Sequence, residues 1–250
     1  MCNRYVSPAA ADIERAWQLT PGEAWRGGSV FPNSAGPFVR ARKGPDRTEG
    51  PAARDSGAPR QDRRELVVGR WGLIPDFAKT AQISWSTNNA RSEEMASKAT
   101  YKTPWRQAQR CIIPALSFDE PNWETGRNLW WTFRRTDGAL WALAGLWNTW
   151  TDRASGEAVE SYTMCTINAD AHPLMSRMHK PDPALAPDAQ DKRSVVVIEA
   201  DDIDTWLHGS EQEARALLRL SAAGIFDAAP AADMSTPRSK PRSSTGRLFD

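Results

Sequence analysis

The chain has 250 residues, of which 40% are hydrophobic and 25% are charged, and its formal net charge is +1. This composition is typical of soluble proteins, and the balanced charge indicates neither a nucleic-acid nor a membrane partner. The cysteines Cys2, Cys111 and Cys165 are too far apart for a disulfide framework or a CxxC-type zinc site. The sequence has no signal-peptide pattern and no apolar run of membrane-spanning length. We therefore expect a cytoplasmic protein that needs no metal or cofactor.

The N-terminal part predicts one helix and one long insertion. Ser7-Pro8 can cap and start a helix that continues to Trp17. Residues 40–65 are rich in Arg, Pro, Gly and Asp and contain almost nothing to bury. We therefore expect a flexible insertion between two strands.

Short runs of β-branched and aromatic residues predict the strands. They cover residues 66–73, 111–118, 129–133, 140–146, 162–167 and 195–198. Pro114 predicts a bulge or an edge position in the second run. Residues 136–139, Thr-Asp-Gly-Ala, predict a hairpin turn that pairs the third run with the fourth.

Two more helices and two flexible segments complete the prediction. Ser92 can open a short helix, and Ser210 and Glu213 form a capping box ahead of apolar residues at helical spacing. Residues 180–194 are expected to form an exposed loop, and residues 228–250 a disordered tail. Residues 1–227 are therefore predicted to form one α+β domain. Its mainly antiparallel, barrel-like β-sheet carries peripheral helices, and its core holds most of the 12 tryptophans.

Cys2 is the first candidate for chemistry. If Met1 is removed, the chain begins with a cysteine, which places a thiol and an α-amine on adjacent carbons. The α-amine has a pKa of about 7.7–8.0, so part of it can form a Schiff base with an aldehyde at neutral pH, after which the thiol closes a thiazolidine ring. Alternatively, the thiolate acts alone as an acyl-transfer nucleophile, or Cys2 is an incidental second residue.

Asn89 and Arg91 lie between a predicted strand and the start of a predicted helix. An Asn side chain offers both a donor and an acceptor, and Arg is suited to bidentate contact with phosphate. The simpler interpretation is that Asn89 closes a turn and that Arg91 pairs with Glu93 or Glu94 on the surface.

Asp119 and Glu120 end an apolar run, and His172 and His179 lie further along the chain. Neighbouring strand residues point to opposite faces, so at most one of the two carboxylates can act as an acid or base in a site. Histidine is suited to proton transfer near neutral pH. The spacing of His172 and His179 does not fit one helix face, which disfavours a two-histidine metal site.

Five groups of motifs occur in order along the chain. They are Met1-Cys2-Asn3-Arg4-Tyr5; Trp71-Gly72-Leu73-Ile74-Pro75; Asn89-Ala90-Arg91-Ser92-Glu93; Arg110-Cys111-Ile112-Ile113-Pro114-Ala115 with Phe118-Asp119-Glu120 and Ala144-Gly145-Leu146-Trp147; and Met175-Ser176-Arg177-Met178-His179. Together they resemble the SOS-response-associated peptidase (SRAP) family of abasic-site processing proteins, over about residues 1–225.

The resemblance implies the SRAP fold and a reaction at abasic sites in single-stranded DNA. After autocatalytic removal of Met1, Cys2 would react with the ring-opened aldehyde of the abasic sugar to form a covalent thiazolidine crosslink. Asn89 matches the residue that holds the new N-terminus. Glu120 matches the proton shuttle, which also assists Met1 removal and crosslink reversal. His179 matches the residue that assists opening of the sugar ring.

The resemblance also implies how DNA is bound. Arg4 and Arg91 match arginines that contact phosphates beside the lesion, Pro32 matches a proline at the DNA kink, and Phe77 lies where an aromatic wedge excludes duplex. The expected partner is single-stranded DNA containing abasic sites, bound without sequence preference by a monomer that associates with the nucleoid when it acts.

This chain departs from the family pattern at several positions. Asn3 stands where glycine is usual, Pro121 follows Glu120 where Trp is commoner, and His179 is followed by Lys-Pro-Asp-Pro instead of x-Arg-Met-Pro. Two other functions remain open at this point. One is a cysteine peptidase or amidase that uses Cys2, His179 and Glu120, and the other is a non-catalytic single-stranded DNA-binding protein.

Overall fold

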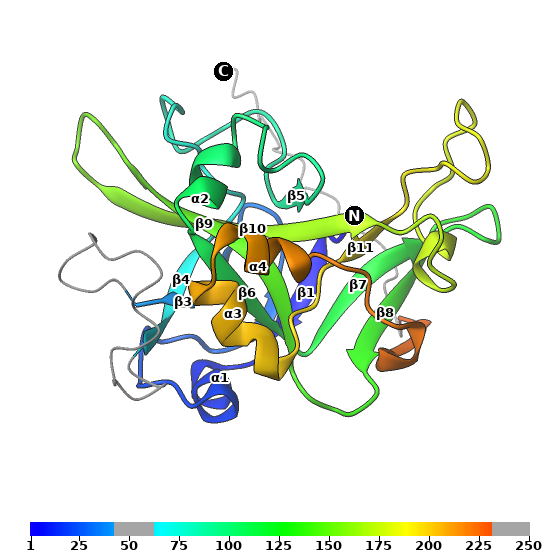
Figure 1. Cartoon of the computed structure of the whole chain (residues 1–250), viewed down its shortest axis with the longest axis horizontal. Helices are drawn as coiled ribbons and strands as arrows, with labels where there is room; N and C mark the ends of the chain where they lie inside the picture. Colours follow the sequence, from blue (N-terminus) through cyan, green and yellow to red (C-terminus); the bar gives the residue numbers. More distant parts are fainter. Residues whose placement is uncertain (43–62, 232–250) are drawn as a thin grey trace, which may run out of the picture.

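The computed structural model describes residues 1–42 and 63–231 (Figure 1). The strands and α-helices in these ranges are β1 (Arg4–Ser7), α1 (Ala10–Trp17), β2 (Gly28–Val30), β3 (Ala35–Ala41), β4 (Arg64–Trp71), β5 (Asn89–Arg91), α2 (Lys102–Arg106), β6 (Arg110–Ala115), β7 (Ser117–Asn122), β8 (Leu129–Arg135), β9 (Trp141–Thr151), β10 (Ala158–Asn168), β11 (Arg193–Val195), α3 (Ile203–His208), α4 (Glu211–Ala216) and β12 (Phe226–Pro230). Short 3-10 turns cover Met175–Arg177, Ala200–Asp202 and Ala223–Ile225.

The strands form a closed barrel and a second sheet beside it. β3, β4, β10, β9 and β6 pair in a ring, because β9 bonds both β6 and β10. Closing the ring leaves no open edge among these strands. The second sheet has the order β12-β8-β7-β1-β2 and stands next to the barrel (Figure 1). The prediction of one α+β domain with a mainly antiparallel, barrel-like sheet is confirmed; the parallel pairs are β10 with β4 and β10 with β5.

Two apolar clusters fill the fold. One lies between the barrel and the second sheet and includes Cys2, Trp71 and Trp141. The other lies between the barrel and the helices and includes Trp105 and Trp206. These four tryptophans are fully buried, as expected from the sequence.

The apolar run 111–118 is two strands instead of one. The chain leaves the barrel at Leu116 and enters the second sheet as β7. The sequence gives no sign of this break because β6 and most of β7 are buried, so the apolar pattern continues through both. The predicted edge position of Pro114 is wrong at the level of the strand, because β6 pairs with β3 on one side and with β9 on the other; Pro114 itself lies beyond the two β3 pairs, at Cys111 and Ile112.

The predicted hairpin of runs 129–133 and 140–146 is wrong. β8 pairs with β7 and β12, whereas β9 pairs with β6 and β10, so the turn connects two different sheets. The turn residues are suited to reversing the chain, and within the turn the Asp137 carboxylate binds Arg135 and the Ala139 amide. The hairpin does not form because β12, and not β9, occupies the edge of β8.

The helices differ from the predictions mainly at their starts. α1 begins at Ala10 without a side-chain cap, because its N-cap residue is Ala9, and the Ser7 hydroxyl instead donates to the Pro8 carbonyl. The segment after Ser92 forms turns instead of a helix, and α2 was not predicted. The capping box of Ser210 and Glu213 is confirmed at α4.

The flexible segments are shorter than predicted where the structure describes them. β3 continues to Ala41 and β4 begins at Arg64, so both ends of the 40–65 insertion are strand, and residues 43–62 lie outside the described residues. β11 covers residues 193–195, so only Val195 of the predicted strand 195–198 lies in it, and Val197 adds a single bridge to Leu143. The predicted exposed loop 180–194 is wrong at its end, where Lys192, Arg193 and Ser194 are buried. β12 runs to Pro230, past the predicted start of the tail, and residues 232–250 lie outside the described part. The limit of the domain at residue 227 stays a prediction. Among the described helices, none has the length and apolar character to cross a membrane.

Candidate functional site

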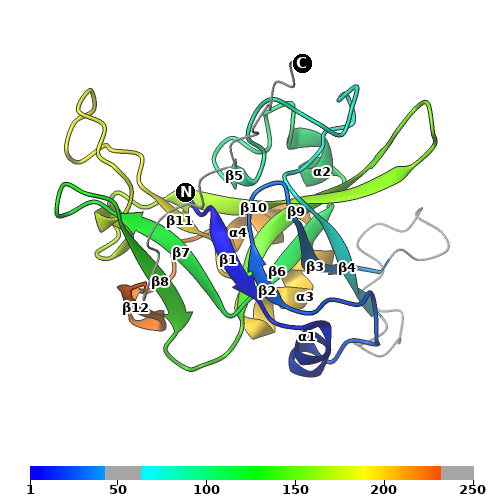
Figure 2. The same ribbon diagram turned by 180° about the vertical axis from the view of Figure 1, so that it is seen from behind.

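The N-terminal strand places Cys2 in the middle of the molecule. β1 pairs with β2 on one side and β7 on the other, and the N-terminus lies at the end of β1 that adjoins β7 (Figure 2). Cys2 is fully buried, and its thiol donates to the Arg4 carbonyl over 3.3 Å. Burial, followed by the charge of Glu120, raises the pKa of the Cys2 thiol well above its ordinary value. The thiol is therefore neutral at pH 7.

Two neighbouring asparagines hold the Cys2 carbonyl. Asn89, at the start of β5, donates its side-chain amide to that oxygen over 2.9 Å, and Asn88 donates to the same oxygen over 3.4 Å. The side-chain oxygen of Asn89 is buried and has no hydrogen-bond partner among the described residues. The sequence analysis missed Asn88, although the Asn88-Asn89 pair was visible in the motif.

Glu120 lies at the centre of the polar cluster. Its Oε2 is 2.8 Å from His179 Nε2 and 3.5 Å from the amine of Met1. Burial by itself raises the pKa of Glu120, but the positive amine and then His179 outweigh burial, so the pKa lies below the ordinary value. The carboxylate is therefore ionised and can accept a proton.

Two hydrogen bonds, one to its amide and one to its carbonyl, hold the backbone of His179. Its amide donates to the Pro121 carbonyl over 2.6 Å, and its own carbonyl accepts from Lys192 Nζ over 2.7 Å. The φ angle of His179 is 64°, in the left-handed region that side chains other than glycine rarely adopt. These bonds fix an uncommon backbone conformation that aims Nε2 at Glu120. The sequence analysis missed Lys192, which is buried and whose pKa burial lowers.

Asp119 and His172, the other candidate acid and histidine, make hydrogen bonds outside the cluster of Cys2 and Glu120. Asp119 accepts from Arg4 over 2.8 Å and from Thr132 over 2.7 Å, so the two neighbouring carboxylates bind different partners. The His172 ring accepts from the backbone amides of residues 174 and 175, and its other nitrogen contacts the Ser221 carbonyl. Neither Asp119 nor His172 contacts Cys2 or Glu120 by a hydrogen bond.

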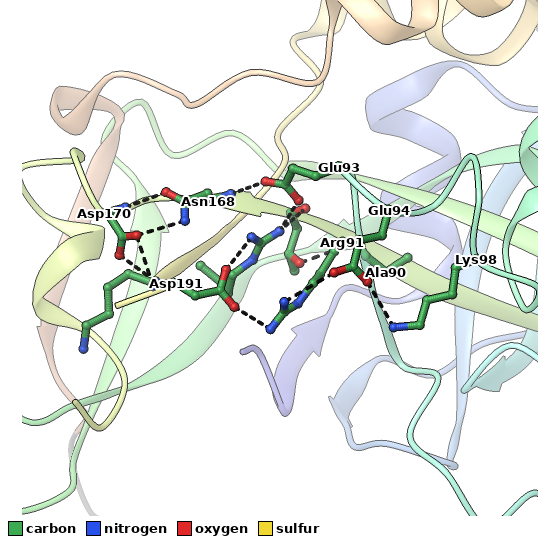
Figure 3. Close-up of polar contacts among 11 residues, drawn as sticks. Ala90, Arg91, Glu93, Glu94, Lys98, Asn168, Asp170 and Asp191 are labelled. Carbon is green, nitrogen blue, oxygen red and sulfur yellow. Dashed lines mark hydrogen bonds and ion pairs between the residues drawn. The ribbon is translucent and has the colours of Figure 1, made fainter. Parts of the chain in front are cut away.

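The two candidate phosphate-binding arginines already pair with carboxylates. Arg4 contacts Asp119, and Arg91 lies 2.5 Å from Asp191 and 3.5 Å from Glu94 (Figure 3). Of the two surface ion pairs considered from the sequence, the one between Arg91 and Glu94 is thus present. Glu93 instead binds Arg193, which also binds Asp191. Opposite charges therefore largely cancel at this rim.

Arg70 joins the two segments on which Pro32 and Phe77 lie. Pro32 is in the turn between β2 and β3, and Phe77 is in the loop between β4 and β5. The guanidinium of Arg70 donates to the Asn33 side chain in the first segment and to the Ala81 carbonyl in the second. Phe77 is exposed and its ring is stacked on that of Trp85.

The site thus combines a buried centre with an exposed rim. The centre holds Cys2, Asn89, Glu120 and His179, which the sequence predicted and the fold brings together. It provides the amine of Met1, the Cys2 thiol and an ionised carboxylate in contact with a histidine. If Met1 is removed, the amine is that of Cys2, which suits addition to a carbonyl with proton transfer. In the described ranges, no cluster of three or more His, Cys, Asp or Glu could hold a metal ion.

Known proteins are similar to this chain in sequence and in fold. The family model described as SOS response associated peptidase (SRAP) matches residues 1–234. Abasic site processing protein YoaM of Bacillus subtilis is 27% identical over 182 residues, which cover 72% of this chain and 73% of YoaM. Abasic site processing protein YoqW of Bacillus subtilis is 32% identical over 124 residues, which cover 49% of this chain and 54% of YoqW. Abasic site processing protein HMCES of Gallus gallus is 27% identical over 213 residues, which cover 76% of this chain and 56% of HMCES. The chain thus spans about half the length of YoqW and of HMCES.

Solved structures are similar to this chain over most of its length. A protein from Bordetella bronchiseptica matches with a TM-score of 0.77 and 30% identity, covering 92% of this chain and 100% of that chain. A protein from Bacteroides thetaiotaomicron matches with a TM-score of 0.69 and 17% identity, covering 93% of each chain, and shows the shared fold alone.

Proposed function

Since the chain belongs to the SOS response associated peptidase family, we propose that it processes abasic sites in DNA and becomes covalently attached to them through Cys2. The relatives named above are abasic site processing proteins. The observation that carries the proposal is the meeting of the N-terminal amine, the Glu120–His179 pair and the buried Cys2 in one cluster.

The first step we propose is removal of Met1. A water molecule, deprotonated by Glu120, attacks the Met1 carbonyl. The peptide bond to Cys2 breaks, its nitrogen gains a proton, and free methionine leaves. The amine of Met1 lies 3.5 Å from Glu120, so this carboxylate is close to the scissile bond. Asn89, which binds the Cys2 carbonyl, holds the rest of the N-terminus in place as the bond breaks.

The second step joins Cys2 to the lesion. The new amine attacks the aldehyde carbon of the ring-opened abasic sugar and water leaves, which gives a Schiff base. The thiol then adds to the same carbon and its proton moves to the nitrogen, so the thiazolidine forms with net loss of one water. Burial keeps the Cys2 thiol protonated, so a base must accept its proton, and the Glu120–His179 pair is the nearest candidate.

The geometry disfavours a general cysteine peptidase. Such enzymes use a histidine to form a reactive thiolate. Here His179 Nε2 contacts Glu120, while the Cys2 thiol donates to a backbone carbonyl and its pKa is raised. A buried neutral thiol without a histidine partner is a poor nucleophile for an external peptide.

We further propose that the substrate strand is single-stranded and contacts the rim. Arg4 and Arg91 would bind phosphates, and Phe77 and Pro32 would contact bases or sugars near the lesion. A net charge of +1 is compatible with this because the contact is local and acidic residues elsewhere offset it.

A denaturing gel tests the proposed function. The protein is mixed with single-stranded DNA that carries one abasic site, and we expect a heat-stable shifted band that is absent with intact DNA. Cys2→Ala should abolish the band, whereas Cys165→Ala, which removes another buried thiol, should retain it. A band of normal intensity from Cys2→Ala would refute the mechanism, and a merely non-covalent complex would favour a non-catalytic DNA-binding protein.

Mass spectrometry tests the two chemical steps separately. The intact mass of the free protein should lack Met1, and the adduct should weigh the sum of protein and DNA less one water. Retention of Met1 in a protein that still forms the adduct would exclude the thiazolidine, because no free Cys2 amine would exist.

A further inference from the structure

The two residues before β11 join the rim of the site to its centre. Asp191 and Lys192 are neighbours in the sequence, but their side chains bind different parts of the site. The Asp191 carboxylate lies 2.5 Å from Arg91 at the rim (Figure 3), whereas Lys192 Nζ donates to the His179 carbonyl over 2.7 Å. The position of this two-residue segment therefore affects both the arginine and the histidine.

One carboxylate holds the backbone of the segment. Asp170, which follows the end of β10 by two residues, accepts the Asp191 amide over 3.0 Å at one oxygen and the Lys192 amide over 2.8 Å at the other. The Ala169 amide donates to the Lys192 carbonyl over 2.7 Å. The φ angle of Asp191 is 53°, in the left-handed region that is uncommon for residues other than glycine. These bonds therefore hold a conformation that the chain rarely adopts without support.

Asp170 is itself fixed and ionised. Asn168 donates its side-chain amide to the Asp170 carboxylate over 3.0 Å, and its side-chain oxygen accepts the Asp170 amide over 3.0 Å. Partial burial by itself raises the pKa of Asp170, but the hydrogen bonds from Asn168 and from the amides of residues 192 and 191 outweigh it, so the pKa lies below the ordinary value. The carboxylate is therefore charged at neutral pH, and a charged acceptor makes hydrogen bonds roughly twice as strong as a neutral one.

The segment would transmit movement from the rim to the centre if nothing held it. Residues 191 and 192 share one planar peptide group, so a shift of one residue moves the other. A phosphate that takes Arg91 from Asp191 would release one end of this group. Among the described residues, the hydrogen bonds of the Asp170 side chain go to this segment and to Asn168, so any effect of Asp170 on the site passes through Asp191 and Lys192.

We propose that Asp170 is a positioning residue of the reaction, which keeps Lys192 on the His179 carbonyl while Arg91 exchanges Asp191 for a phosphate of the strand. This proposal rests on the proposed function and adds to it a residue that acts on His179 from outside the cluster of Cys2 and Glu120. The two hydrogen bonds of Asp170 allow the rim to change partners without moving the histidine away from Glu120.

The test compares carboxylates that hold the backbone in the same way. The proteins are wild type, Asp170→Asn, Lys192→Met, the double variant of these two, and Asp152→Asn. Asp152 is the matched control because it accepts the amides of residues 154 and 155, in the turn between β9 and β10 that lies far from the N-terminus (Figure 1). The readouts are the crosslinking rate at saturating single-stranded DNA with one abasic site, and the melting temperature.

The expected losses of rate follow from the path of contacts. Asp170→Asn keeps the shape of the side chain but turns an NH₂ group toward a backbone N–H, so the crosslinking rate should fall by about tenfold, as for a slightly misplaced catalytic group. Asp152→Asn should keep the wild-type rate, even if the melting temperatures of both variants fall alike. The double variant should be no slower than Lys192→Met, because Asp170 acts through Lys192.

Nuclear magnetic resonance of the protein without DNA gives a readout that does not depend on crosslinking. The chain has only three histidines, so their ring signals can be assigned individually. Asp170→Asn should shift the ring signals of His179 and leave those of His208, at the end of α3, unchanged. Asn168→Ala keeps the charge of Asp170 and tests the same role if Asp170→Asn does not fold; it should slow crosslinking about threefold, as for loss of one hydrogen bond.

A wild-type rate in Asp170→Asn, or a double variant whose loss is the product of the two single losses, would overturn the positioning role. So would unshifted His179 signals together with a lower melting temperature, which would leave Asp170 a role in stability alone. Absence of any crosslink with wild type would instead overturn the proposed function, and the His179 signals would still show whether Asp170 positions the histidine.

Discussion

The buried centre and the exposed rim of the site are built in opposite ways. In the centre, polar groups point at one another: the buried Glu120 contacts both His179 and the N-terminal amine. At the rim, Arg91 is bound to Asp191 and Glu94 before any DNA arrives (Figure 3). Under the proposed function, the centre is organised in advance for chemistry, whereas the rim would exchange protein carboxylates for phosphates.

Substitution in the centre should produce the largest effect on rate. Glu120→Gln keeps the shape of the side chain but removes the base, so crosslinking should slow by about 10²–10⁴-fold, the usual contribution of acid–base catalysis. Affinity for a non-reactive strand with a tetrahydrofuran residue should change by no more than about twofold, since the exposed rim is unaltered. Asp119→Asn, on the adjacent residue, serves as the matched control because Asp119 contacts Arg4 and not His179. A large loss of affinity in Glu120→Gln would show that centre and rim are not separate.

An intermediate effect is expected where the backbone positions His179. Lys192→Met removes the donor to the His179 carbonyl and should slow crosslinking by about 10–100-fold, as for a misplaced catalytic group. Lys192→Arg should restore part of the rate. Lys180→Met, which removes a neighbouring exposed charge, should leave the rate near that of wild type.

The pH dependence of the rate shows how Lys192 acts. A shifted pH–rate profile in Lys192→Met indicates altered contact between His179 and Glu120. An unchanged profile together with a lower melting temperature would instead assign Lys192 a purely structural role.

The centre should also affect stability in acid. The pKa of Glu120 in the folded protein lies below its ordinary value, because the amine and His179 outweigh burial. The carboxylate therefore contributes to the free energy of unfolding above the unfolded pKa of about 4.3, and this contribution disappears as pH falls through the folded pKa. Urea unfolding of samples whose N-terminal residue has been identified by mass should show a steeper loss of stability below pH about 4 in wild type than in Glu120→Gln. Parallel curves would contradict the lowered pKa.

The smallest effect is expected at the rim. Asp191→Asn frees Arg91 from a carboxylate, so affinity for single-stranded DNA should rise by about two- to fivefold, the scale of an exposed ion pair. The slope of log affinity against log salt should steepen by about 0.7, as for one more phosphate contact. Asp12→Asn, which removes a carboxylate paired with Arg15 on α1, is the control for net charge. Reduced affinity in Asp191→Asn would mean that Asp191 orients Arg91 for DNA instead of competing with it.

The sequence predicted which residues meet in the buried centre better than which strands pair in the sheets. The motifs around Cys2, Asn89 and Glu120 are local, so these residues were singled out before the distances between them were known, and their roles stay predictions. Lys192 was missed because a lysine in a polar loop resembles any solvated charge. Only the packing of residues 180–192 against β10 and β11 brings its ammonium to the His179 carbonyl.

The strand partners were not predictable from the same patterns. A turn signal at residues 136–139 specifies a reversal of the chain, but it does not specify that the two flanking strands bond each other. β8 and β9 separate into different sheets because β8 bonds β7 and the distant strand β12, whereas β9 bonds β6 and the next strand along the chain, β10.

By itself, the sequence determined the α+β class, the capping box of α4 and several buried tryptophans, and it singled out the candidate residues that the fold brings together. These depend on local chemistry and on the periodicity of apolar residues. The tertiary structure alone decided the closure of the barrel, the break at Leu116 and the pairing of Arg91 with Asp191. It also decided the parallel exposure of Phe77 and Trp85. The closure, the break and the ion pair depend on contacts between segments far apart in the chain, whose free energy no local pattern records.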